Sequence, residues 1–199
     1  MKIIPIIYIL LFLLASCKST EKKEGTDKII DIDSIKSKPE PVSFFPVTDY
    51  IKGQLFEIRN GGVNPMKFVT INKHTDSAWL KMEDLKNEAT AFLSPEIDST
   101  NLTDLFVEKK FMDQTLNAIT FTYDPIKPLP DSFLLQHWDV YVDPDKNNVR
   151  EVYLVKLLPG KKNQLLTWES GKSFNIKNVV TDKAGKVIIE KEITIKWHF

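Results

Sequence analysis

The sequence predicts an α+β fold in which two N-terminal helices pack on a curved antiparallel β-sheet of about seven or eight strands. Two observations lead to this prediction. Apolar residues recur at helical spacing within residues 48–92, whereas from residue 106 onward apolar and polar residues alternate along short segments. Turn-forming residues separate these segments, and short turns join antiparallel neighbours, so we expect a meander.

The two helices are expected at the start of the folded domain. Thr48 or Asp49 can cap the first helix, and the Asn-Gly-Gly sequence at residues 60–62 should end it. Ser77 can open the second helix, which the Ser-Pro pair at residues 94–95 should end. Each helix carries apolar residues along one face, and this face should pack on the sheet.

The predicted strands share an alternation of apolar and polar residues. In residues 187–199 this alternation continues to the last residue, so one face should be buried while the other, which carries His198, should be wet. The core face of this strand should hold Ile189, Ile193, Ile195, Trp197 and Phe199. The strands are expected at residues 66–71, 106–112, 116–123, 134–142, 149–158, 164–168, 173–181 and 187–199.

The N-terminal segment has the pattern of an export signal. Lys2 precedes an apolar stretch at residues 3–14, which is short for a bilayer span that needs roughly 20 residues. The stretch ends in Leu14-Ala15-Ser16-Cys17, which resembles the lipobox of bacterial lipoproteins. This resemblance implies that residues 1–16 are a signal peptide removed after Ser16, and that Cys17 carries a thioether-linked lipid and an acyl chain such as palmitate.

Residues 17–43 should form a lipidated, flexible tether, because they are rich in charged and polar residues and contain few apolar ones. The richness in Lys and Ile, with a charged segment after Cys17, resembles lipoproteins of Bacteroidota-type bacteria. Lys18 and Ser19 follow Cys17, and the absence of Asp at position 18 is the pattern that favours the outer membrane in enterobacteria. Residues 44–199 should then form a single domain, held at the cell envelope by the lipid.

Composition excludes several classes of function. The chain has 27 acidic and 27 basic residues, so it lacks the basic excess that nucleic-acid binding needs. Cys17 is the only cysteine, which leaves the mature domain without disulfides, cysteine nucleophiles or cysteine metal ligands. His74, His137 and His198 are not at metal-ligand spacing, and no known catalytic motif is present. We therefore expect no cofactor, no metal and no catalytic residue.

Two features nevertheless resemble functional sites. His137 and Asp139 lie two residues apart on a predicted strand, so their side chains share one face. Such a pair suits a general base, and it also suits an ordinary solvated strand face. Residues 143–148 resemble the first half of a calcium loop, but the expected glycine and the final glutamate are missing. A hairpin turn explains that segment better.

Three functional hypotheses follow from the sequence, of which the third, a purely structural tether, predicts the same sequence features as the first. The first is a non-enzymatic envelope lipoprotein that binds a partner protein, an apolar ligand or a sugar through its sheet. Trp138, Trp168, His137 and Asp139 would face the ligand, in a pocket between the sheet and the helices. The alternative role for the two tryptophans is simple core packing. The second hypothesis is a hydrolase-like enzyme that uses His137 and Asp139, and the lack of a nucleophile favours the first.

Overall fold

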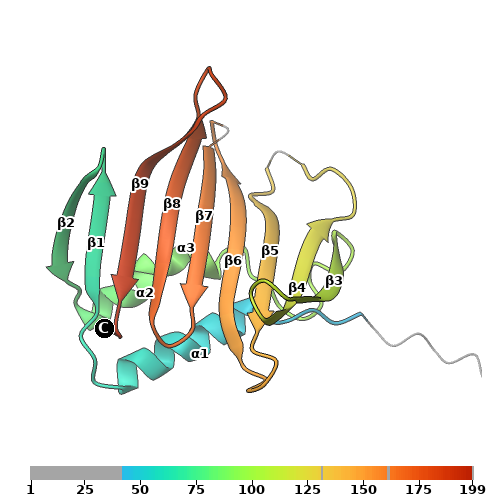
Figure 1. Ribbon diagram of the computed structural model, residues 1–199, viewed down its shortest axis with the longest axis horizontal. Helices are drawn as coiled ribbons and strands as arrows, with labels where there is room; N and C mark the ends of the chain where they lie inside the picture. The colour runs from blue at the N-terminus through green and yellow to red at the C-terminus, as the bar shows by residue number, and fades with distance from the viewer. Residues whose placement is uncertain (1–41, 131, 161, 199) are drawn as a thin grey trace, which may run out of the picture. The chain divides into compact units, whose positions relative to one another are not determined.

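A single nine-stranded antiparallel sheet forms the body of the protein, in the order β2-β1-β9-β8-β7-β6-β5-β4-β3 (Figure 1). The computed structural model describes residues 42–130, 132–160 and 162–198. From β3 to β9 consecutive strands are neighbours, which confirms the predicted meander. The strands are β1 (Met66–Ile71), β2 (His74–Trp79), β3 (Phe106–Asp113), β4 (Ala118–Pro125), β5 (Leu135–Val142), β6 (Val149–Leu158), β7 (Lys162–Glu169), β8 (Ser173–Thr181) and β9 (Val187–Lys196).

The α+β class and the antiparallel sheet are thus confirmed, whereas the expected seven or eight strands are nine. The first helix, α1, spans Val47–Asn60, and it stops where the Asn-Gly-Gly sequence was expected to stop it. Its N-cap is Pro46 rather than Thr48 or Asp49. The Thr48 hydroxyl instead accepts a hydrogen bond from the backbone N–H of Ile97 (2.7 Å), which ties the start of α1 to a distant loop.

The prediction of a second long helix from Ser77 is wrong. Ser77 belongs to β2, which pairs with β1 through a two-residue turn. The turn residues Asn72 and Lys73 have φ values of 51° and 68°, the left-handed backbone that tight hairpins require. Pairing with β1 therefore overrides the helical spacing. Only short helical pieces follow, namely η2 (Met82–Asp84), α2 (Leu85–Glu88) and α3 (Thr90–Leu93).

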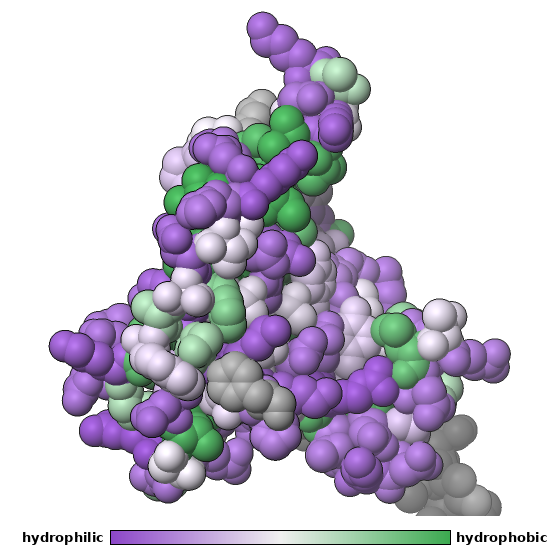
Figure 2. All heavy atoms as spheres, turned by 60° about the vertical axis from the view of Figure 1, so that its left-hand side comes forward, coloured by the Kyte–Doolittle hydropathy of each residue, from purple (hydrophilic) through white to green (hydrophobic). Residues whose placement is uncertain are grey.

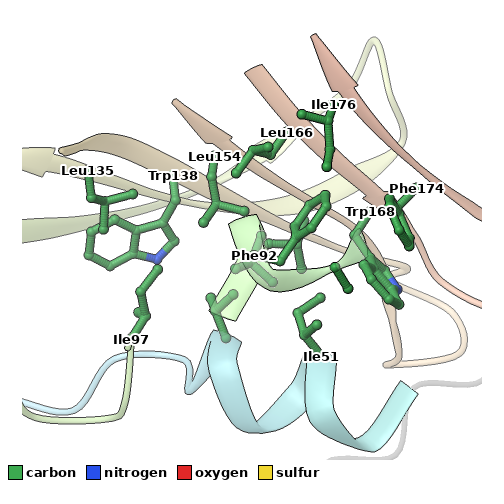
Figure 3. Close-up of a cluster of buried hydrophobic side chains, with 14 of the residues drawn as sticks. Ile51, Phe92, Ile97, Leu135, Trp138, Leu154, Leu166, Trp168, Phe174 and Ile176 are labelled. Carbon is green, nitrogen blue, oxygen red and sulfur yellow. The ribbon is translucent and has the colours of Figure 1, made fainter. Parts of the chain in front are cut away.

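The hydrophobic core lies between the sheet and the helices, which all cover the same face (Figures 1 and 3). Ile51 reaches this core from α1 and Phe92 from α3, and both are fully buried. The sheet contributes large inward-facing side chains. Those with almost no exposed surface are Phe106, Tyr123, Leu135, Trp138, Leu154, Leu166, Trp168, Phe174 and Ile195. This packing leaves the opposite face of the sheet uncovered by helices.

The last strand is a core element only in its second half. Ile195 and Trp197 are buried as predicted, while Ile189 has 47% of its surface exposed, in contrast to the prediction. The difference arises because the β8–β9 hairpin extends past its neighbouring strands and beyond the helices (Figure 1). β9 itself ends at Lys196, and Phe199 lies outside the described residues.

Candidate functional site

His137 and Asp139 lie on the face of the sheet opposite the helices, which we call the outer face. Residues of β5 alternate between the two faces, so Trp138 and Val140 point into the core. A β-bulge between Leu135 and His137 shifts the register by one residue. Leu135 and Trp138 can therefore both face inward while His137 turns outward.

Three side chains form a hydrogen-bonded cluster on the outer face. His137 Nε2 lies 2.9 Å from Asp139 Oδ2, and His137 Nδ1 lies 2.9 Å from Asp124 Oδ1. Asp124 is at the end of β4, the strand next to β5. Sequence reasoning missed Asp124, because the pairing register of β4 with β5 was the only signal that could have placed it beside His137.

Both carboxylates of this cluster have further partners. Asp139, only 8% exposed, accepts hydrogen bonds from the hydroxyls of Thr122 (2.6 Å) and Tyr141 (3.3 Å). Asp124 pairs with Lys109 at 2.9 Å, and this bond lowers the pKa of Asp124. The hydrogen bond to Asp139 raises the pKa of His137, which favours its charged form. Each carboxylate of the cluster therefore contacts His137 and at least one further hydrogen-bond donor.

This geometry does not suit a catalytic base. A general base needs a free lone pair that faces the substrate, but each ring nitrogen of His137 already contacts a carboxylate. The two hydroxyls nearby, those of Thr122 and Tyr141, donate to Asp139 rather than to the imidazole. No group of three or more His, Cys, Asp or Glu in the described part of the chain could hold a metal ion. As arranged, the cluster cross-links β4 and β5.

Trp138 and Trp168 do not reach the outer face. Both are fully buried, Trp138 stacked on Tyr123 (ring centroids 4.5 Å apart) and Trp168 on Phe174 (5.1 Å). Figure 3 shows them inside the layer between the sheet and the helices, where side chains fill the space that was expected to form a ligand pocket. The two tryptophans therefore belong to the core, and we leave them out of the candidate site.

The outer face carries side chains in cross-strand rows, because directly paired residues of an antiparallel sheet point to the same side. The pairing registers from β4 to β9 define one continuous row of half-buried or buried polar residues. At about 4.8 Å between strands, the row is about 24 Å long. We call it the middle row: Thr122, Asp139, Tyr153, Thr167, Asn175 and Thr194.

The middle row runs into a shallow groove over β7, β8 and β9. Thr167, Asn175 and Thr194 line this groove, which has a volume of about 380 Å³. Asn175 donates hydrogen bonds to Thr194 Oγ1 and to Glu192 Oε1, both at 2.7 Å, so its amide is held in a fixed orientation. The remaining lining residues are all charged or polar: Glu169, Lys172, Ser173, Lys177, Lys196 and His198.

Comparison of the chain with protein-family models, with curated proteins and with solved structures finds no match. Its function must therefore be argued from its own residues. Cys17, the expected lipidation site, lies outside the described residues, as do the predicted signal peptide and most of the predicted tether. None of the helices within the described ranges is long and apolar enough to cross a membrane.

Proposed function

We propose that the chain is a lipoprotein anchored in the outer membrane of the cell envelope, and that its domain is a non-enzymatic binding module. The resemblance of Leu14-Ala15-Ser16-Cys17 to a lipobox supports the anchor. The uncovered outer face supports the binding role, because a sheet face without helices is free to meet a ligand. The binding surface is the middle row with the groove at its end.

The chemistry of this surface favours a sugar over a protein partner. Protein interfaces need an apolar centre, whereas the middle row presents hydroxyl, amide and carboxylate groups. Sugar hydroxyls both donate and accept hydrogen bonds, so they complement half-buried hydroxyl groups such as those of Tyr153 and Thr167. Tyr153 in the middle row, with Tyr141 beside it on β5, adds half-buried aromatic rings on which an apolar sugar face can pack.

The observation that carries this proposal is the continuity of the middle row with the groove. A row of six polar residues across six strands, β4 to β9, matches an extended ligand better than a single small molecule. The hydrolase-like alternative has less support, because His137 has no ring nitrogen free for a substrate.

A nuclear magnetic resonance titration tests the proposal. The mature chain with Cys17→Ala would be titrated with neutral β-1,4-linked hexasaccharides of glucose and of N-acetylglucosamine. We expect the largest amide chemical-shift changes at Tyr153, Thr167 and Asn175. Asn175→Ala should bind at least tenfold more weakly, because the amide that holds Glu192 and Thr194 in place is lost. These expectations rest on the geometry of the groove lining.

Asn178→Ala is the matched control, because it removes the same side chain from the same strand outside the middle row and should leave binding unchanged. Shifts that map to other parts of the sheet, or equal losses in both variants, would contradict the proposed surface. Cleavage of the hexasaccharide that disappears in His137→Asn would instead establish the hydrolase alternative.

Lipidation of Cys17 is a separate prediction. In cells fed labelled palmitate, Cys17→Ala should take up no label and should leave the membrane fraction, because the thioether can form only on a thiol. Ser19→Ala, outside the lipobox-like sequence, should be labelled as the natural chain is. A Cys17→Ala protein that is still labelled and still sediments with membranes would show that the anchor has been assigned wrongly.

A further inference from the structure

The far end of the β8–β9 hairpin exposes a cluster of aliphatic side chains. Val187, Ile188 and Ile189 are 63%, 42% and 47% exposed, and Ile71 at the end of β1 is 47% exposed. We call these four residues the apolar tip. Figure 2 shows hydrophobic residues gathered just below the extreme end of the molecule, under a cap of hydrophilic ones.

The apolar tip is unusual for a strand in water. Alternation normally hides every second residue, yet three consecutive residues of β9 are exposed here. The cluster lies on two neighbouring strands, because Ile71 of β1 pairs with Lys191 of β9, two residues along the chain from Ile189. Single exposed apolar residues are ordinary, but a contiguous group of this kind marks an interaction surface.

The charges around the apolar tip have mostly one sign. Lys73, Lys183, Lys186 and Lys191 are exposed and form no ion pair with any residue that the structure describes. Three carboxylates lie near these lysines, and each already has a partner: Glu192 pairs with Lys177 at 3.5 Å. Asp182 accepts hydrogen bonds from the turn N–H groups of Ala184 and Lys186, and Glu190 pairs with Lys162 at 2.7 Å.

We propose that the apolar tip inserts into the headgroup region of an anionic lipid bilayer. The hairpin would lie along the membrane surface, so that its aliphatic side chains enter the boundary of the acyl chains while its hydrophilic turn and the four lysines stay among the lipid phosphates. The hairpin keeps its backbone hydrogen bonds, such as Asp182 N–H to Lys186 O (2.9 Å). Insertion therefore leaves few backbone polar groups without a hydrogen-bond partner. A second copy of the chain is a poorer partner, because its own lysines would oppose these lysines.

This contact goes beyond the proposed lipid anchor and does not require it. An acyl chain on Cys17 would hold the domain near the bilayer but would leave its orientation free. The apolar tip would add a second attachment point far along the chain and would orient the outer face with respect to the membrane. Because the two attachments use different residues, either can fail without the other.

Co-sedimentation with lipid vesicles tests the inference in the mature chain with Cys17→Ala, which has no acyl anchor. We expect the chain to bind vesicles of phosphatidylcholine that contain 30% phosphatidylglycerol, which makes them about one-third anionic. Binding should be weaker to vesicles of pure phosphatidylcholine and in about 0.5 M salt. The double variants Val187→Ser/Ile188→Ser and Lys183→Glu/Lys186→Glu should each partition at least tenfold less. All four positions are exposed, so folding should be retained.

Phe56→Ser removes an exposed apolar residue from α1, and Lys127→Glu/Lys146→Glu makes the same charge change at exposed sites elsewhere. Both should bind vesicles as the parent chain does. Equal losses in these controls, absence of vesicle binding, or self-association that depends on the apolar tip would overturn the inference. Loss of palmitate labelling in the Cys17→Ala experiment bears only on the anchor, so the two proposals fail separately.

Discussion

Deletion of residues 193–199 should abolish cooperative folding of the domain. This segment supplies Ile195, fully buried, and Trp197, only 7% exposed. It also pairs with Met66–Val69 of β1 on one side and with Ser173–Ile176 of β8 on the other, so its loss removes most of the pairing that joins the β1–β2 hairpin to the sheet. Truncation of one large buried aromatic residue costs about 3 to 5 kcal/mol, whereas a whole domain is stable by only about 5 to 15 kcal/mol.

Thermal unfolding followed by near-ultraviolet circular dichroism would measure this effect, because that signal reports fixed packing of the tryptophans. His198→Ala is the control: its side chain is exposed, and the free energy of unfolding should change by about 0.5 kcal/mol or less. A truncated chain that melts cooperatively near the temperature of the natural chain would show that the end of β9 is not part of the core.

The local sequence pattern predicted the sheet and the first helix well and the second helix poorly. The alternation of apolar and polar residues placed β1, β6 and β8 at their observed bounds, because burial on one face forces a period of two. The same logic failed at residues 77–79. Apolar spacing there suggested a helix, but the tight turn at Asn72 and Lys73 extends the chain back along β1. Contacts between strands decided the structure at that point.

The candidate site shows the same division between local and distant information. The shared face of His137 and Asp139 follows from their spacing of two residues along one strand. The contact of His137 with Asp124 depends on a register between two strands, which no local pattern encodes. The roles of Trp138 and Trp168 depended on how completely the helices fill the space against the sheet, and only the packed core decides this.

Lys156 combines burial with a lack of acidic partners. It lies on the core face of β6, is 3% exposed, and its ammonium donates hydrogen bonds to the backbone oxygens of Ala91 and Ser94. These oxygens lie at the end of α3, where helical carbonyls lack intrahelical donors. Two carbonyl dipoles compensate only part of the desolvation, and burial lowers the pKa of Lys156 to about 8.

The unfolding free energy should therefore depend on pH through Lys156. Between about pH 8 and the usual lysine value of 10.5, the unfolded chain binds the proton more tightly than the folded chain, so stability must rise with pH in this window. Urea unfolding at several pH values would measure it. The unfolding free energy of the natural chain, taken relative to that of Lys156→Met, should rise by up to about 3 kcal/mol across the window. Lys172→Met, which removes an exposed lysine, is the matched control for the loss of one cationic side chain. If this difference in unfolding free energy does not change with pH, water reaches the Lys156 ammonium, and the end of α3 is more open than the packed core implies.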